Sequence, residues 1–272
     1  MPLRHNEWGE SSMSYPSKII CLTEETVETL YLLGRSDLIA GVSKYVERPL
    51  QAKNNHPQVS QFIRSDIEQI VSMSPDLVIG FSDIQKDIAK ELVGRGLNVF
   101  ITNQRSLKEI LEQILLLGRM VGEQAKAIKL VEEFSAKLNE YCAMSQGKPK
   151  VKVYFEEWDQ PRLSCIQWVS ELIEICGGVN IFKHKSGSLA INRSVSDEEI
   201  VALNPDAIIG CWCGKKVKLE SFSQRQNYQN IKAIQNLHVF EVDPAIFLQP
   251  GPALFLDGLS RMFEILEKVR GP

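Results

Sequence analysis

Two stretches of this sequence align without a gap: Glu68-Gln-Ile-Val-Ser-Met-Ser-Pro75-Asp76-Leu-Val-Ile-Gly80 and Glu198-Glu-Ile-Val-Ala-Leu-Asn-Pro205-Asp206-Ala-Ile-Ile-Gly210. The copies lie 130 positions apart, from Pro75 to Pro205, in a chain of 272 residues. Each copy predicts a short amphipathic helix, a Pro-Asp break and an apolar strand of the kind buried in a parallel sheet. The repeat therefore predicts two similar α/β lobes that face each other across a ligand-binding cleft.

The composition is ordinary for a soluble globular protein, with 44% hydrophobic and 24% charged residues. A net charge of −3 gives no support for nucleic acid or an anionic membrane as a partner. No apolar run approaches the roughly 18 residues needed to span a bilayer. The segment from Met1 to Lys18 is polar and lacks the apolar region of a secretory signal. We expect a cytoplasmic protein, or a periplasmic or membrane-associated one if a signal was removed.

The six cysteines lie mostly within apolar segments and show no spacing typical of a disulfide framework. Reduced thiols are the expectation for such a pattern. The cysteines are Cys21, Cys142, Cys165, Cys176, Cys211 and Cys213.

Alternating strand and helix patterns predict two lobes, 17–105 and 148–272, with mostly parallel sheets and helices on both faces. The first lobe is expected to have strands at 18–22, 38–43 and 98–102 and helices at 24–34 and 84–94. The second is expected to have strands at 152–156 and 238–242 and helices at 169–176, 219–234 and 254–268. Residues 106–147 start with a capping box, Ser106-Leu-Lys-Glu109, and predict one long helix that could divide at Gly118 or Gly122.

An ordered series of segments carries a family resemblance: Lys18-Ile-Ile-Cys-Leu, Gly41-Val-Ser-Lys-Tyr45, Val59-Ser-Gln-Phe62, Pro75-Asp76-Leu-Val-Ile, Glu171-Leu-Ile-Glu-Ile-Cys-Gly-Gly178, Val195-Ser196, Pro205-Asp206 and Gln249-Pro-Gly-Pro252. From Lys18 to its C-terminus the chain resembles the cobalamin and iron-siderophore class of ABC-transporter solute-binding proteins. The resemblance implies two Rossmann-like lobes joined by a long bracing helix, with ligand in the cleft between them.

Four further segments resemble a subgroup that lacks a signal peptide and is labelled cobalamin-binding: Cys21-Leu-Thr-Glu-Glu25, Gly80-Phe-Ser-Asp83, Phe155-Glu-Glu-Trp-Asp159 and Cys211-Trp-Cys-Gly-Lys-Lys216. The resemblance implies non-enzymatic binding of a corrinoid-like or metal-chelate ligand, cobalamin or similar. The protein would serve an ABC importer as its solute-binding component, or act as an intracellular carrier. We expect a monomer with no catalytic cofactor and no bound metal of its own.

Glu68 and Glu198, one in each repeat copy, fall where the family has glutamates that grip arginines on the transporter's membrane subunits. Two exposed carboxylates on separate lobes would make a two-point electrostatic dock. The alternative is a helix N-terminal acid that complements the helix dipole, a role that Asp66 and Asp197 would serve equally well.

The resemblance aligns Tyr45, Phe62 and Phe81 with aromatic residues that wrap a corrinoid. In the second lobe Leu163 and Asn192 stand near places where the family has aromatic residues, and nearby tryptophans could substitute. For each aromatic residue, packing in the core is an equal alternative. The ligand-binding residues expected in the second lobe, by this substitution or by position, are Glu157, Trp158, Trp168, Trp212, Lys215 and Gln249.

Acidic residues follow the first strand of each lobe, at Thr23-Glu24-Glu25 and at Glu156-Glu157-Trp158-Asp159. Such clusters could bind a cationic group or a metal, or act as acid and base. For the first cluster, helix capping by Thr23 with acids in the first turn is an alternative.

The motif Cys211-Trp-Cys213-Gly-Lys215-Lys216 follows the second repeat strand. Alternation along that strand would place both thiols on one face, and a thiol beside lysines can have a lowered pKa. Lys215 or Lys216 could instead contact an anionic ligand group. No GxGxxG, Walker A, GxSxG or HExxH motif is present. The alternative to a binding protein is a cytoplasmic enzyme on the same scaffold that uses the cleft acids and Cys211 or Cys213.

Overall fold

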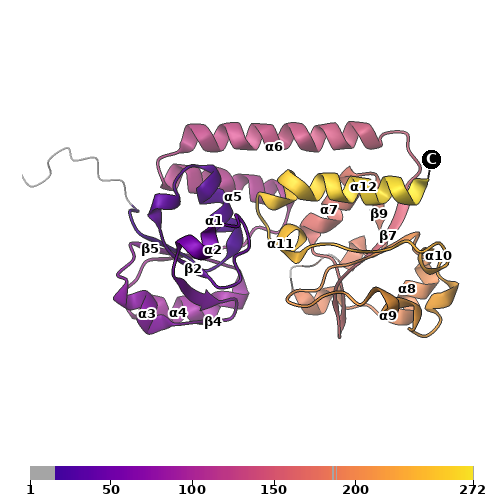
Figure 1. Ribbon diagram of the computed structural model, residues 1–272, viewed down its shortest axis with the longest axis horizontal. Coiled ribbons are helices and arrows are strands. Elements are labelled where there is room, and N and C mark those ends of the chain that lie inside the picture. The colour runs from indigo at the N-terminus through magenta and orange to yellow at the C-terminus, as the bar shows by residue number, and fades with distance from the viewer. Residues whose placement is uncertain (1–15, 186, 188, 272) are drawn as a thin grey trace, which may run out of the picture. The chain divides into compact units, whose positions relative to one another are not determined.

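The computed structural model describes residues 16–185, 187 and 189–271, which form two compact α/β units (Figure 1). Unit 1 runs through Thr102 and includes Leu115–Ala127. Unit 2 comprises Asn103–Ile114 and the chain from Ile128 onward. The two-lobed α/β fold predicted from the repeat is confirmed. Within the described ranges no helix is both long and apolar enough to cross a membrane.

Unit 1 is built on a six-stranded sheet in the order β4-β3-β2-β1-β5-β6. Strands β1 (Ile19–Cys21) and β5 (Leu77–Phe81) lie inside the sheet, and all of their residues are buried. All pairings are parallel except that of β3 with β4. The outer strands are β2 (Ile39–Ser43), β3 (Gln58–Gln61), β4 (Arg64–Ser65) and β6 (Val99–Thr102).

Helices cover both faces of this sheet (Figure 1). α3 (Ile67–Ser72) and α4 (Lys86–Gly94) pack on one face, where Ile70 and Leu92 are fully buried against Val78 of the sheet. α1 (Glu24–Leu32) lies on the other face, next to the short α2 (Ala52–Asn55). The expected alternation of strand and helix in the first lobe is confirmed, with element ends shifted by at most two residues.

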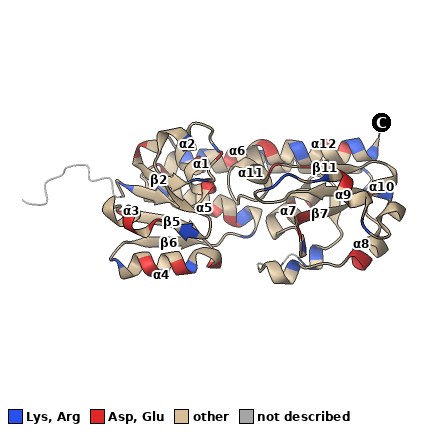
Figure 2. Cartoon of the chain, turned by 60° about the horizontal axis from the view of Figure 1, so that its bottom comes forward, with Lys and Arg blue, Asp and Glu red and all other residues tan. Residues whose placement is uncertain are grey.

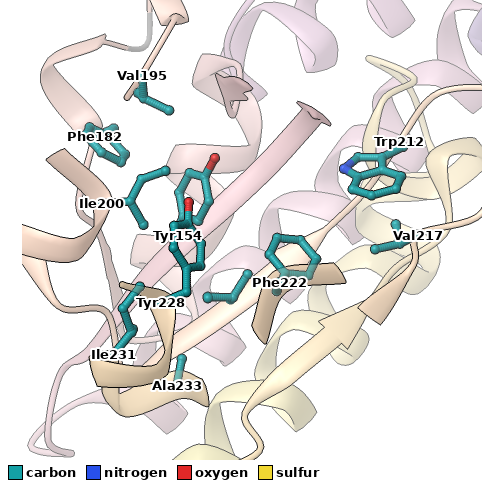
Figure 3. Close-up of a cluster of buried hydrophobic side chains, with 11 residues drawn as sticks. Tyr154, Phe182, Val195, Ile200, Trp212, Val217, Phe222, Tyr228, Ile231 and Ala233 are labelled. Carbon is teal, nitrogen blue, oxygen red and sulfur yellow. The ribbon is translucent and has the colours of Figure 1, made fainter. Parts of the chain in front are cut away.

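Unit 2 has a five-stranded sheet in which β7 (Val151–Asp159) is central. Strands β10 (Ala207–Gly210), β11 (Val239–Glu241) and β9 (Gly178–Asn180) run parallel, and β8 (Arg162–Ser164) pairs with β7 as an antiparallel hairpin. One face is covered by α7 (Gln167–Ile175) and α12 (Leu259–Arg270). The other buries an aromatic cluster beneath α8 (Asp197–Leu203), shown in Figure 3.

The helix expected over 106–147 divides at Gly122, one of the two glycines at which the sequence allowed a break. The chain forms α5 (Leu107–Met120) and α6 (Gln124–Ser145), and Gly122 between them has a φ of +75° that glycine adopts readily. Gly118 allows α6 to return against α5, because a Cβ there would lie 2.3 Å from the Cβ of Ala127. Both helices contribute residues to both units.

The helical region expected over 219–234 is not one continuous helix. The chain forms α9 (Leu219–Ser223), a 3-10 turn at Tyr228–Asn230 and α10 (Lys232–Gln235). Asn227, with a φ of +64°, breaks the helical path. A short α11 (Pro244–Phe247) follows β11, and a π-helical turn at Leu254–Gly258 leads into α12.

The Pro-Asp repeat builds the same contacts in both units. In unit 1 the carboxylate of Asp76 accepts the backbone N–H of Lys18 (2.9 Å), and the Lys18 ammonium donates to the carbonyl of Met73 (2.8 Å). Each repeat thus fastens the start of the first strand to the end of its helix. In unit 2 the carboxylate of Asp206 accepts the backbone N–H of Lys152, and the Lys152 ammonium donates to the carbonyl of Leu203, both at 2.9 Å.

Candidate ligand-binding surfaces

A buried glutamine that the sequence interpretation missed holds the carboxyl edge of the sheet in unit 1 together. The Gln85 amide donates to the carbonyls of Phe62 (2.9 Å) and Leu22 (3.4 Å) and accepts the N–H of Phe81 (2.9 Å). Gly80 leaves room for it, because a Cβ there would lie 2.6 Å from the Gln85 oxygen. A lone glutamine after a strand has no motif, so only its tertiary contacts identify it.

The three aromatic residues expected to line the site in unit 1 differ in exposure. Tyr45 is 53% exposed and Phe62 is 36% exposed, so both are accessible to a ligand. Phe81 is buried within β5, which matches the alternative of core packing. Ile63, which follows Phe62 in the β3–β4 turn, is also exposed and was not predicted.

Glu24 and Glu25 are buried in the first turn of α1. Glu24 accepts the N–H of Glu47 (3.3 Å), and burial raises its pKa to about 8. Glu25 accepts the hydroxyl of Thr23 (2.6 Å), and burial raises its pKa to about 7. The Thr23 side chain makes no capping bond to the helix backbone, so the capping alternative is wrong for that residue.

The acidic cluster expected at a turn of the second lobe lies instead in the β7–β8 hairpin, because β7 continues to Asp159. Glu156 is completely buried and forms a two-point ion pair with Arg225 at 2.6 and 2.8 Å. It also accepts the hydroxyl of Tyr154 (2.9 Å) and the indole N–H of Trp212 (3.1 Å). The Glu156 carboxylate thus accepts hydrogen bonds from Arg225, Tyr154 and Trp212, and it holds these side chains together in the core.

Glu157 is paired with Arg193, a residue that the sequence interpretation did not single out. The Arg193 guanidinium is buried and lies 2.6 Å from the Glu157 carboxylate. Burial nevertheless raises the pKa of Glu157, and its Oε2 finds no hydrogen-bond partner among the described residues. Glu157 therefore lies under the surface of the hairpin rather than free in solution.

An open apolar pocket of about 420 Å³ lies beside this hairpin. One wall comes from the β7–β8 hairpin, where Leu163 pairs with Ser194 in an isolated β-bridge. The other wall is the segment before α8, in which Ile191 is 75% exposed. Asn192, near the expected aromatic position, neighbours this wall. The lining residues are Trp158, Pro161, Leu163, Ala190, Ile191 and Ser194.

Lys215 lies next to this pocket. Its ammonium is 4.2 Å from the ring centre of Trp158 and 4.9 Å from that of Trp212. It also forms an ion pair with Asp159 at 2.6 Å. Although partial burial opposes the change, this pairing lowers the pKa of Asp159. The ammonium is thereby held in one place while 41% of the side chain stays exposed.

The strand alternation expected for the two thiols does not apply to them, because β10 ends at Gly210. Cys211 is buried, while Cys213 is exposed in a turn. Burial raises the pKa of Cys213, and the nearby Glu157 carboxylate adds to the effect. The lowered pKa considered from the sequence is therefore wrong. All six cysteines, each in the described part of the chain, are free thiols.

Two of the expected tryptophans are core residues. Trp168 is buried and its indole N–H donates to the carbonyl of Phe247 (2.9 Å). Trp212 is buried beside Val217 and Phe222 in the aromatic cluster (Figure 3). Gln249 is half-buried in the turn after α11. Trp158 alone of the three tryptophans lines the pocket.

Glu68 and Glu198 are exposed in the first turns of α3 and α8, and neither caps its helix. Asp66 caps α3, while Ser196 and Glu199 form a capping box on α8. Figure 2 shows acidic residues on α8. Glu68 forms an exposed ion pair with Arg95 (2.5 Å), whose hydrogen bond lowers the pKa of Glu68. Both glutamates lie in the first turn of a helix, so the alternative of an acid that complements the helix dipole stays open beside docking.

Comparisons with known proteins agree with this architecture. The chain is 26% identical over 259 residues to YvrC of Bacillus subtilis (strain 168), an uncharacterized ABC transporter substrate-binding lipoprotein, covering 92% of this chain and 79% of the relative. It is 24% identical over 263 residues to a vitamin B12-binding protein of Vibrio vulnificus, covering 93% and 92%.

Two solved structures have the same fold. The periplasmic vitamin B12 binding protein BtuF of Vibrio cholerae has a TM-score of 0.75 at 22% identity, covering 94% of this chain and 98% of that chain. A periplasmic heme binding protein of Pseudomonas aeruginosa has a TM-score of 0.79 at 17% identity, covering 91% of each. The family model described as periplasmic binding protein matches residues 19–246. The expectation of a non-enzymatic binding protein is confirmed: this chain belongs to the periplasmic binding protein family.

Proposed function

We propose that this protein binds a corrinoid-like or other large metal-chelate ligand as the solute-binding component of an ABC importer. The observation that carries the proposal is the apolar pocket of unit 2, formed by Trp158, Leu163 and Ile191 at the hairpin. Relatives of the same fold are named for vitamin B12 and for heme, two large and flat metal chelates.

The pocket offers an apolar surface on which one face of such a ligand can pack. Its volume of about 420 Å³ lies within the usual range for small-molecule sites, and its lining is apolar. Ile191 is 75% exposed to water, and covering this apolar side chain with an apolar ligand would be favourable. In unit 1, Tyr45 and Phe62 offer accessible aromatic surface of the same kind.

Titration with cyanocobalamin, dicyanocobinamide, haemin and a ferric siderophore, followed by absorbance and thermal shift, tests the proposal. The variant Ile191→Asp should weaken binding about tenfold or more, because it places a charge against an apolar ligand face. Leu237→Asp is the matched control, since Leu237 is 84% exposed and lies outside the pocket. Absence of binding by all four chelates would exclude the proposed ligand class.

Glu68 and Glu198 are the docking residues of this proposal. Their exposure, one on each repeat copy, supports it. In vesicles that contain the membrane subunits, Glu68→Arg and Glu198→Arg should each reduce transport, whereas Glu132→Arg on α6 should not. Equal transport by all three variants would exclude docking by this pair.

The compartment is a separate proposal. The polar segment behind the cytoplasmic expectation, residues 1–15, lies outside the described residues. In the cytoplasm the protein would act as an intracellular carrier, whereas the importer role requires a periplasmic or membrane-associated protein. Fractionation of native cells with a periplasmic marker enzyme distinguishes the two, and co-fractionation with that marker would favour the importer.

A further inference from the structure

Lys215 lies next to the apolar pocket, and the side chains around it determine the position of its ammonium group. Lysine side chains on a surface usually sample many rotamers, and fixing one costs side-chain entropy. Here the indole rings of Trp158 and Trp212 and the carboxylate of Asp159 already hold the ammonium. A ligand that binds this ammonium therefore loses little further entropy.

The ammonium keeps bonding capacity for a ligand. An ammonium group has three N–H donors, and Asp159 takes one of them. No second acceptor for it is found within residues 16–185, 187 and 189–271. With 41% of its side chain exposed, Lys215 can donate to a second anionic group without breaking the first ion pair.

Trp158 joins this cation to the pocket. The indole lines the apolar wall and carries the Lys215 ammonium over its ring. A planar ligand body packed along this wall would thus present its edge to the ammonium. Carboxylates form charge-assisted hydrogen bonds with ammonium groups, which are stronger than neutral ones.

We propose that Lys215 binds a carboxylate or similar anionic group on the edge of the ligand. The ligand class is then a flat, apolar metal chelate with an acidic edge, rather than one whose acidic groups are all amidated or esterified. This inference rests on the proposed function and deepens it, because it names the chemistry that selects among chelates.

Binding of matched acid and ester probes tests the inference. Haemin and its dimethyl ester share a metal and a ring, as do heptacarboxylic cobyrinic acid and its heptamethyl ester. The natural protein should bind the acid of at least one pair about tenfold more tightly than its ester. Lys215→Met should abolish this preference, and Lys215→Arg should retain it. Lys216→Met is the matched control, an exposed neighbour that should leave the preference unchanged.

The outcomes separate this inference from the proposed function. Equal binding of acid and ester by the natural protein, or an acid preference that survives in Lys215→Met, would overturn the role of Lys215 and leave chelate binding intact. If no acid, ester or cobalamin bound to the folded natural protein, the proposed function itself would fail. Circular dichroism of each variant verifies folding, and Lys215→Arg supplies the readout if Lys215→Met does not fold.

Discussion

Replacing Glu24 with glutamine should stabilise the protein, and increasingly so as the pH rises. Glu24 is 5% exposed, and burial raises its pKa from an ordinary 4.5 to about 8. Its side chain accepts the backbone N–H of Glu47 at 3.3 Å. Glutamine has the same shape and can accept this bond, but it has no proton to lose. The substitution therefore removes the cost of ionisation and keeps the contact.

The sign follows from the two pKa values. Since the folded pKa lies above the unfolded one, unfolding releases a proton at any pH between about 4.5 and 8. Stability is then full below pH 4.5 and decreases as pH rises toward 8. Each pH unit in this interval costs about 1.4 kcal/mol. Glu24→Gln should recover on the order of 3 kcal/mol at pH 7 and on the order of 5 kcal/mol at pH 9.

Urea unfolding at pH 5, 7 and 9, followed by circular dichroism, measures this effect. Glu25, whose pKa burial raises to about 7, remains in the variant, and its charge contributes to the raised pKa of Glu24 in the natural protein. Glu47→Gln is the matched control, because that side chain is exposed in the same loop and should change stability little. A variant no more stabilised at pH 9 than at pH 5 would refute the reasoning from burial.

Two other changes test the buried contacts. Arg225→Met should destabilise unit 2 by about 3 to 5 kcal/mol, because Glu156 would stay buried without its ion-pair partner. In urea unfolding, the double variant with Glu156→Gln should recover most of this loss, and an additive loss would contradict the pairing. Asp206→Ala should lower the stability of unit 2 by about 1 to 3 kcal/mol, because the Lys152 N–H loses its acceptor, and Asp76→Ala should lower that of unit 1 by about the same. Amide hydrogen exchange of β7 and β1 measures each loss of stability, and unchanged protection would argue against the shared contacts of the repeat.

Local patterns in the sequence were sufficient for the architecture. The helix, Pro-Asp break and apolar strand of each repeat are short-range features, so they predicted α3 with β5 and α8 with β10. The same reasoning left open whether the helix over 106–147 divides, because periodicity continues across Gly122 although the chain reverses there. A hydrophobic period records which face is buried and does not record against which neighbour it packs.

For the candidate site too, the sequence indicated some of the residues but not their partners. Sequence position alone indicated Glu157, Trp158 and Lys215, since they follow the strands of an α/β unit where ligands bind. Their ion-pair partners are far away in the chain: Lys215 is 56 residues from Asp159, and Glu157 is 36 residues from Arg193. Only the folded structure decides such pairs, because they depend on which strands become neighbours.

The sequence by itself determined two α/β units, their parallel sheets and the segments that end at the carboxyl edges of those sheets. Tertiary structure decided which of the expected residues lie in the core, as Trp168 and Trp212 do, and which line a pocket, as Trp158 does. It also decided the direction of the pKa changes at Glu24 and Cys213. The physical reason is that burial and charge pairing are properties of the surroundings, which distant parts of the chain supply.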